Sequence, residues 1–555
     1  MEADYWPRRK VTCSALAALT LLSVTCSSAA AGEDSADRPP VSLVAAARAA
    51  STHVAVADPG STLAEGWQHG AFIEIFVRGY KDSDGDGIGD LQGLVQSLDY
   101  LRDLGIRGIW LMPVTRSQDH DHGYSVSGYR DIEPAYGSLA DFDELLRQAH
   151  ARGIGVIVDY VINHSAAANP IFLAASESAE NPFRNWYVWR DVAPVGWKVM
   201  GKDPWVGTGN GAFLAQFSPS MPDFNMLDPA VVTFHKDNLR FWLNLGVDGF
   251  RFDAVPHLVE NGPDAWYDQP ADYTLMGEFR AVVDGYSRRY VVCEATSNAI
   301  GYAAPDVCGG AFALDRGKDI VNAARGEQTA IHAVADYFKA APARMATMIS
   351  NHDLFAGERL WDQVHGNLAQ YRLAAATYLL EPGTPFIYYG EEIGMSAAAG
   401  LSGDAKLRTP MSWAAEPGNG GFTEGKPYRA VASNVVQRNV QSQRSDRHSL
   451  LAYYQSLLAL RNRYPSLARG SYQAPFVKGQ VLGYWREVED ESTLVLINYG
   501  TRPATVLVQG PAQPGRYQRV FPDASGPDLA FGSAGKLQVL VPAQSLLVFA
   551  AASKR

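Results

Sequence analysis

Three short apolar segments of this sequence each end on an acidic residue, and this pattern limits the folds that the chain can adopt. Residues 247–252 lead to Asp253, residues 289–293 lead to Glu294, and residues 345–352 lead to Asp353. Runs of this kind are typical of buried β-strands, each of which would carry its acid at its C-terminal end. The three acids can meet only if the strands run parallel around one centre. The pattern therefore predicts a parallel barrel with a site at the carboxyl ends of its strands.

Strand-like and helix-like patterns alternate along residues 66–472. The predicted strands are 71–77, 106–111, 154–159, 248–253, 289–294, 310–315, 345–350 and 385–389. The predicted helices are 91–103, 140–152, 230–245, 271–286, 327–340, 367–380 and 448–463. Eight strands joined by helices close a (β/α)8 TIM barrel of the α/β class, so we assign residues 66–472 to a catalytic barrel.

Two stretches depart from this alternation. Residues 165–228 follow the third strand and are rich in Trp, Tyr and Phe, which predicts an inserted domain. Its aromatic rings suit a sugar-binding platform, although each ring taken alone is more often part of a local core. From residue 473 to 555 short β-like runs at 481–485, 493–498, 504–508 and 537–541 are separated by Gly, Pro and Asp. We expect a C-terminal antiparallel β-sandwich there.

Four motifs resemble glycoside hydrolase family 13, the α-amylase family, and they occur in the order found in that family. They are Asp159–His164, Gly249–His257, Glu294 after Val291–Cys293, and Asn351–Asp353. The resemblance covers about residues 66–550. It implies a TIM-barrel glycosidase that retains the anomeric configuration, with residues 165–228 as the family's domain B.

The three acids can be given roles from the chemistry of glycoside cleavage, which needs a proton donor and a nucleophile or base. Asp253 is the predicted nucleophile, because Arg251 would leave the same face of the strand and keep the carboxylate ionised. Glu294 is the predicted acid/base, since neighbouring anions and a partly apolar site raise a carboxyl pKa. Asp353 would bind sugar hydroxyls and hold the distorted ring.

The resemblance also implies residues that contact the substrate. Tyr124 would stack on the sugar being cleaved and His122 would line the same subsite, while Asp159 would orient its neighbours. A histidine taken alone is more often structural. The full set predicted to bind substrate is Tyr124, His122, His164, Arg251, His257, His352 and Arg359.

Residues 82–90 contain four aspartates and three glycines, which is typical of a calcium loop. Position 12 of an EF-hand should be Glu and is Gly93 here, so the loop is not an EF-hand. The alternative is a solvated acidic turn, but four acids so close together would repel one another. By the family resemblance, Ca²⁺ would be held by Asp82, Asp84, Asp86, the carbonyl of Ile88 and Asp90.

The N-terminus has the organisation of an export signal. Arg8, Arg9 and Lys10 precede an apolar run that is too short for a membrane-spanning helix, and residues 29–31 provide a cleavage site. We therefore assign residues 1–31 to a signal peptide and expect a periplasmic or secreted protein with no membrane attachment after cleavage. Residues 32–65 are rich in Ala, Ser, Asp and Pro and predict a mobile or loosely packed leader.

Net charge and cysteine content limit which partners and which cysteine chemistry are possible. The formal net charge of −11 argues against a nucleic-acid partner, and we expect a monomer. Outside the signal peptide only Cys293 and Cys308 remain. They could form a disulfide in an oxidising compartment, or Cys293 could be a buried free thiol.

The predicted function is hydrolysis of α-1,4-glucosidic bonds in starch, maltodextrins or maltooligosaccharides. The alternative within enzymes is an exo-acting α-glucosidase or a glucosyl-transferring enzyme similar to trehalose synthases. A non-catalytic glycan-binding module is disfavoured because all three acids are present. The choice between endo and exo action stays open.

Overall fold

The computed structural model describes residues 42–511, 514–532 and 535–551. The predicted signal peptide, residues 1–31, and the first part of the leader lie outside the described residues. So do Cys13 and Cys26.

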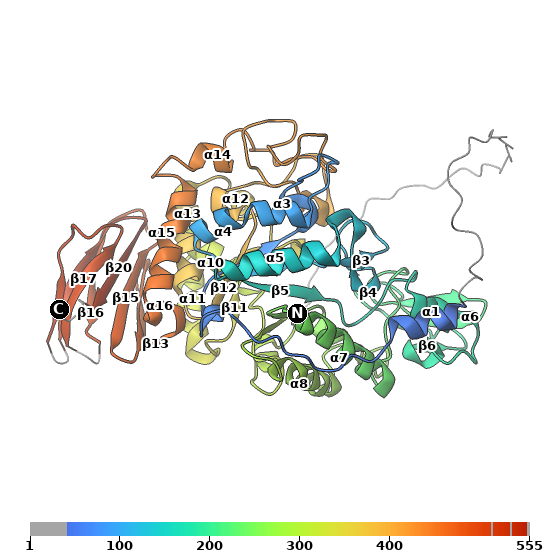
Figure 1. The fold of residues 1–555 in the computed structure, drawn as a ribbon. Coiled ribbons are helices and arrows are strands. Elements are labelled where there is room, and N and C mark those ends of the chain that lie inside the picture. The colour runs from blue at the N-terminus through green and yellow to red at the C-terminus, as the bar shows by residue number, and fades with distance from the viewer. Residues whose placement is uncertain (1–41, 512–513, 533–534, 552–555) are drawn as a thin grey trace, which may run out of the picture. The chain divides into compact units, whose positions relative to one another are not determined.

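A seven-stranded parallel sheet forms the centre of the fold (Figure 1). Its strands are β1 (Phe72–Ile75), β2 (Gly108–Leu111), β5 (Gly155–Tyr160), β9 (Gly249–Phe252), β10 (Tyr290–Cys293), β11 (Ala346–Thr347) and β12 (Thr384–Tyr388). They lie in the order β10-β9-β5-β2-β1-β12-β11. The predicted (β/α)8 barrel with its C-terminal β-domain is confirmed.

The predicted strand 310–315 is reduced to two isolated parallel bridges, Cys293 to Ala311 and Phe312 to Ala346. These bridges join the two edges of the sheet and so complete the barrel. The segment is short because Arg316 N donates to Ala313 O, which turns the chain into helix α10 (Arg316–Ala324).

The inside of the barrel is filled with large apolar side chains. Phe72, Trp110, Ile157, Phe312 and Phe386 belong to one buried cluster. Phe72 and Phe386 stack with their ring centroids 4.7 Å apart. The barrel is therefore a packed core, and open space for a ligand lies at its ends.

Helices surround the barrel, as predicted from the 3.6-residue pattern (Figure 1). They include α3 (Leu91–Gln96), α4 (Leu98–Leu104), α5 (Leu139–Ala151), α7 (Pro229–Asn244), α8 (Pro270–Asp284), α11 (Gln328–Ala340), α13 (Leu368–Leu380) and α15 (Leu450–Arg463). The predicted helix 91–103 is divided at Ser97, whose hydroxyl donates to Gly93 O. Helix α10 was not predicted. Ser138 and Asp141 form a capping box that sets the start of α5.

The insertion after β5 folds around its own aromatic residues. It contains α6 (Pro170–Glu177) and a small sheet of β6 (Trp189–Arg190), β8 (Gly211–Leu214) and β7 (Trp205–Thr208). Trp197 and Trp205 are both buried, and their ring centroids lie 5.5 Å apart. These two rings form local core and do not offer a platform to a sugar.

Residues 43–65 of the predicted leader contact the rest of the chain at a few points, and most of them are exposed. Helix α1 (Leu43–Ala50) packs against α6. The carboxylate of Asp58 accepts hydrogen bonds from the backbone and hydroxyl of Ser287, and Leu63 is buried. Small apolar residues of this segment find a partner surface that composition cannot reveal.

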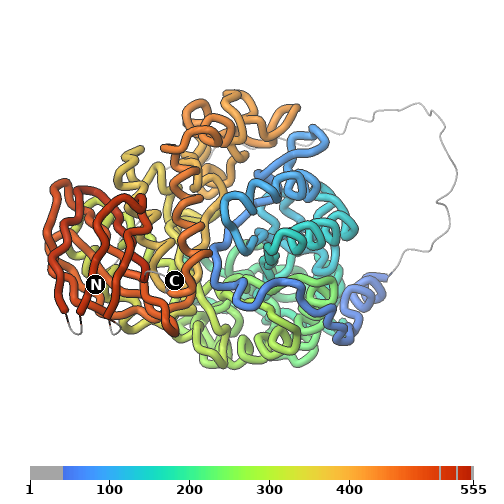
Figure 2. Tube along the Cα trace, turned by 60° about the vertical axis from the view of Figure 1, so that its left-hand side comes forward, coloured from blue at the N-terminus to red at the C-terminus, as the bar shows by residue number. Residues whose placement is uncertain are grey.

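The C-terminal domain consists of β13 (Ser471–Lys478), β14 (Val481–Val488), β15 (Glu491–Asn498), β16 (Ala504–Gln509), β17 (Gly515–Phe521), β18 (Leu529–Phe531), β19 (Lys536–Val541) and β20 (Ser545–Ala551). The domain is the red part of the trace in Figure 2. Its six-stranded sheet and the β16–β19 pair enclose a second hydrophobic core. The domain docks on α13 through the Tyr499 and Thr377 hydroxyls, 2.8 Å apart. No helix among the described residues is long and apolar enough to cross a membrane.

Candidate active site

Three acids from three strands meet at the carboxyl end of the barrel. Asp253 follows β9, Glu294 follows β10 directly, and Asp353 lies a short loop beyond β11. Asp253 and Glu294 are buried, and the Asp353 side chain is 21% exposed. The structure thus brings together the three residues for which the sequence predicts catalytic roles.

Arg251 is the centre of this cluster. Its Nη1 lies 2.5 Å from Asp253 Oδ1 and 2.8 Å from Asp159 Oδ1, and its Nη2 lies 2.8 Å from Glu294 Oε2. Glu294 Oε2 also accepts a hydrogen bond from the backbone N–H of Ala254 at 3.0 Å. One buried guanidinium therefore holds the two reactive carboxylates on its adjacent nitrogens.

Asp353 is held from both sides by cations. Its Oδ1 lies 2.5 Å from Arg408 Nη2 and its Oδ2 lies 3.0 Å from His352 Nε2. The other ring nitrogen of His352 lies 2.6 Å from Glu74 Oε1. The Tyr124 hydroxyl contacts His352 Nε2 at 2.7 Å, and the two rings stack. Tyr124 and His352 therefore lie beside the predicted sugar-binding acid.

The environments of the acids set their pKa values apart. Burial raises the pKa of Glu294 to about 7, and Asp253 and Asp353 add to this while Arg251 opposes it. Burial raises the pKa of Asp253 to about 6 despite Arg251. Arg251 was expected to keep Asp253 ionised. It does lower the pKa of this carboxyl, but burial is the larger effect.

The third acid has the opposite shift. Burial opposes the charged form of Asp353, but His352 and Arg408 hold the pKa of this carboxyl well below its usual range. Although burial acts against it, Asp353 and Glu74 raise the pKa of His352 to about 10. Asp353 is therefore an anion at neutral pH, with a charged imidazole beside it.

The other predicted histidines are neutral. Burial lowers the pKa of His164 to about 3 and that of His257 to about 4. His164 Nε2 lies 3.2 Å from the carbonyl oxygen of Tyr124, and His257 Nδ1 lies 3.0 Å from Gln216 Oε1. His122 is 26% exposed, and its ring lies next to Tyr124, with the centroids 5.6 Å apart. Of the three histidines, His122 is the one whose ring lies next to the Tyr124 ring.

Arg359 does not join the acid cluster. It is buried, and its Nη1 donates to Tyr389 O at 2.8 Å while its Nη2 donates to Leu407 O at 2.6 Å. The prediction that Arg359 binds substrate is therefore wrong, because its guanidinium holds two stretches of backbone together.

Two residues of the cluster were not predicted from the sequence. Arg408 lies in the long irregular segment after β12 and carries no motif. Glu74 lies within the apolar strand β1 and is buried. A charged residue inside a fully buried strand was the available signal for Glu74, since such a charge needs a partner.

The acidic loop after β1 brings together three of the predicted calcium ligands. Carboxylate oxygens of Asp82, Asp84 and Asp86 all lie within 4.8 Å of one another. Asp90 instead accepts hydrogen bonds from Gly93 N and Ser83 N, both at 2.7 Å, and caps α3. Asp82, Asp84 and Asp86 form a hard oxygen donor set that fits Ca²⁺. Ile88 belongs to the same loop through its backbone N–H, which donates to Asp86 Oδ1 at 2.7 Å.

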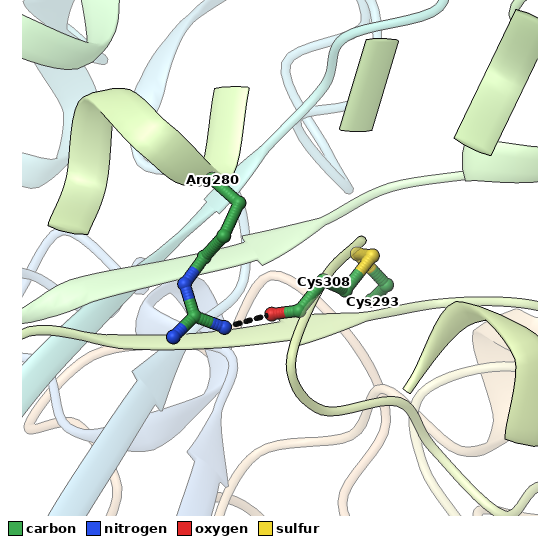
Figure 3. Close-up of a disulfide and its surroundings, with 3 residues drawn as sticks. All are labelled: Arg280, Cys293 and Cys308. Atoms are coloured by element: carbon green, nitrogen blue, oxygen red, sulfur yellow. Dashed lines mark hydrogen bonds between the residues drawn. A yellow bond between two sulfur atoms is a disulfide. The ribbon is translucent and has the colours of Figure 1, made fainter. Parts of the chain in front are cut away.

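Cys293 and Cys308 form a disulfide (Figure 3). Of the two alternatives that the sequence left open, pairing is the one in the structure. The bridge closes the segment that begins with Glu294. Arg280 of α8 donates to the carbonyl oxygen of Cys308 at 2.5 Å and holds the far end of this segment.

Comparison with known proteins gives consistent matches. Residues 74–470 match the family model of the α-amylase catalytic domain. Alpha-amylase 3 of Dictyoglomus thermophilum is 31% identical, over 78% of this chain and 85% of its own length. A probable alpha-glucosidase of Rhizobium meliloti is 31% identical, over 79% of this chain and 90% of its own. The structure of the alpha-glucosyl transfer enzyme XgtA superposes with a TM-score of 0.74 at 27% identity, covering 88% of this chain and 99% of that one.

Proposed function

The chain belongs to the α-amylase family, glycoside hydrolase family 13, and from this premise we propose that it hydrolyses α-1,4-glucosidic bonds in starch, maltodextrins or maltooligosaccharides. The observation that carries the proposal is the pair of carboxylates, Asp253 and Glu294, on one guanidinium. The two carboxylates are held close together by the two terminal nitrogens of Arg251. In retaining glycosidases the two carboxyl groups are about 5–5.5 Å apart.

In the proposed mechanism Asp253 attacks the anomeric carbon while Glu294 protonates the leaving oxygen. The bond to the leaving sugar breaks, and a covalent glycosyl-enzyme ester forms on Asp253. Glu294, now a carboxylate, then takes a proton from water, which attacks the anomeric carbon and releases Asp253. A pKa of about 7 suits Glu294 to both steps.

Asp353 would accept hydrogen bonds from sugar hydroxyls and favour the distorted ring. Its low pKa supports this role, because it stays an anion throughout the working range of Glu294. Tyr124, stacked on His352, would offer its ring to the apolar face of the same sugar.

A second candidate activity is exo-acting α-glucosidase or glucosyl transfer. The relatives support it, because proteins named alpha-glucosidase and alpha-glucosyl transfer enzyme are about as similar in sequence to this chain as the one named alpha-amylase. The same two carboxylates serve either activity, because only the acceptor in the second step differs: water in hydrolysis, a sugar in transfer.

A product time course separates these activities. The mature chain is incubated with maltoheptaose, maltose and soluble starch, beside an Asp253→Asn variant. Mixed short oligosaccharides that disappear in the variant support the α-amylase type. Glucose or transfer products from maltose support the second candidate, and activity that survives in Asp253→Asn contradicts the role of Asp253.

We further propose that Asp82, Asp84 and Asp86, with Asp90 and the Ile88 carbonyl, hold a structural Ca²⁺. Bound there, the ion would neutralise the loop's negative charge and tie it down, remote from bond cleavage. Export to the periplasm or the medium is also proposed. The Cys293–Cys308 disulfide supports an oxidising compartment.

A further inference from the structure

A cavity of about 430 Å³ lies at the end of the barrel opposite the acid cluster. Tyr290 and Val291, the first residues of β10, line it, and so does Thr384, which begins β12. Glu294 follows the other end of β10. A ligand in this cavity would therefore not compete with a sugar at the acid cluster.

The lining of this cavity is strongly basic, although the chain as a whole carries a net charge of −11. None of the described residues that line it is Asp or Glu. The basic residues of the lining, called here the arginine pocket, are His69, Arg280, Arg289, Arg344, Arg469 and Arg486.

Part of this charge has no counter-ion. Arg280 pairs with Asp284 and Arg469 pairs with Glu489. Arg289 lies between two carboxylates, 3.6 Å from Asp58 and 3.7 Å from the buried Asp248. Neither Arg344 nor Arg486 forms an ion pair with any residue in the described ranges. The Arg344 side chain is exposed and also makes no hydrogen bond there.

The charge behind the pocket wall increases the imbalance. Arg486 and its neighbour Arg461 are both buried, and Arg461 Nη1 donates only to carbonyl oxygens, those of Leu379 and Glu381. Arg486 likewise donates to the carbonyls of Leu380 and Gly470, each at 2.9 Å. Buried charges are ordinarily paired, because desolvation is costly.

The excess of positive charge also affects the pKa values of ionisable groups nearby. Burial and the repulsion of Arg486 lower the pKa of Arg461 to about 9. Burial also raises the pKa of Glu381 to about 7, although Arg316 and Arg486 act against this, and neither oxygen of its carboxylate has a hydrogen-bond partner among the described residues. Glu381 therefore compensates the buried cations only in part at neutral pH.

We propose that the arginine pocket binds a small phosphate-bearing molecule. Guanidinium groups present planar pairs of donors that match phosphate oxygens, and a doubly charged anion would compensate the unpaired positive charge. The volume lies in the range of small-ligand sites. Figure 3 shows Arg280, one of the lining residues, held by the carbonyl oxygen of Cys308.

Isothermal titration calorimetry on the full mature chain tests the proposal. The probes are inorganic phosphate, pyrophosphate and glucose 6-phosphate, in a buffer without other multivalent anions. We expect saturable binding of one anion per chain that weakens as salt is added. In the variant Arg344→Ala/Arg469→Ala, Kd rises at least tenfold, whereas the control Arg147→Ala/Arg447→Ala, which removes two exposed charges elsewhere, keeps the wild-type Kd.

The outcomes are distinct. Tightest binding of glucose 6-phosphate supports an organic phosphate, and tightest binding of phosphate or pyrophosphate supports an inorganic one. Circular dichroism and melting temperature establish that the pocket variant is folded, since both substituted residues are solvent-accessible. Absence of saturable binding for all three probes, or equal Kd values in the two double variants, overturns the proposal.

Discussion

Arg251 Nη2 lies 2.8 Å from Glu294 Oε2, and the same guanidinium also holds the neighbouring acids of the cluster. Arg251 is itself buried, so its single charge is compensated within the barrel, whereas the three carboxylates that it contacts are compensated only in part. The stability of the fold and the protonation of the reacting groups therefore depend on one side chain.

Replacing Arg251 by Met should leave buried carboxylates without a counter-charge. We expect a loss of about 3–5 kcal/mol in the free energy of unfolding, with Arg251→Lys less affected because it keeps the charge. Asp253 and Glu294 already have raised pKa values, so the loss should be largest above pH 7, where both are ionised, and smallest near pH 4. Denaturant unfolding at several pH values measures this. If the loss of stability does not vary with pH, it results from lost packing and not from the lost counter-charge.

The pH dependence of kcat/KM should be bell-shaped. Asp253 must be ionised to attack, so activity falls as pH drops below its pKa of about 6. Glu294 must be protonated to donate, so activity falls as pH rises above about 7. The maximum is expected between these values, in an initial-rate profile on maltoheptaose. A profile that is flat from pH 5 to 9 contradicts the assignment of both residues.

Glu294→Gln should discriminate between substrates by their leaving groups. We expect kcat on maltooligosaccharides to fall about 10²–10⁴-fold, because the leaving oxygen is no longer protonated. The leaving group of an aryl α-glucoside with an acidic phenol needs little protonation. The rate of the first step on this substrate should therefore fall much less. The matched Asp253→Asn variant should lose activity on both substrates. Equal losses for Glu294→Gln on the two substrates would rule out its role as general acid.

The Cys293–Cys308 disulfide should stabilise the segment that follows Glu294. The two cysteines are 15 residues apart, and closing a loop of about this length contributes roughly 3 kcal/mol in the chain-entropy model. Cys293→Ser/Cys308→Ser should therefore melt at a lower temperature than the wild type. Dithiothreitol should lower the melting temperature of the wild type and leave that of the double variant unchanged. Free thiols detected in untreated protein without residues 1–31, and therefore without Cys13 and Cys26, would contradict this prediction.

Calcium should raise the melting temperature through the acidic loop. The expected result for Asp84→Ala is a lower melting temperature that no longer responds to added Ca²⁺ or to a chelator, because one carboxylate of the three-aspartate group is lost. Differential scanning fluorimetry with and without chelator measures this. As a control, Asp143→Ala removes a carboxylate from helix α5 and should keep the response. If wild type and Asp84→Ala respond alike, the loop does not hold the ion.

Local sequence pattern was sufficient for most of the barrel. The strands are short apolar runs and the helices have amphipathic spacing, so both could be located without knowledge of their neighbours. Two predicted strands were exceptions. In 310–315 only Ala311 and Phe312 have bridge partners, and of 345–350 only Ala346 and Thr347 form a strand, β11. Pairing of this kind depends on where the adjacent strands lie in space.

The site also contains residues that could be predicted from the sequence and residues that could not. Asp253, Glu294 and Asp353 could be predicted because each follows a recognisable apolar run of the sequence. In the structure Asp253 and Glu294 directly follow β9 and β10, whereas Asp353 lies a short loop beyond β11. Arg408 could not, since it reaches Asp353 from a segment 55 residues further along that has no regular pattern. Arg359 shows the reverse, because a position close to a motif does not determine where its guanidinium points.

The sequence by itself determined the barrel, the order of its strands along the chain and the three acids at their ends. These features follow from local periodicity and from residue type. The tertiary structure alone decided which cation holds which acid, how far burial raises the pKa of Asp253, and that arginines from distant segments gather in one pocket. Electrostatic energies depend on distance and on exclusion of water, and neither is set until the chain is folded.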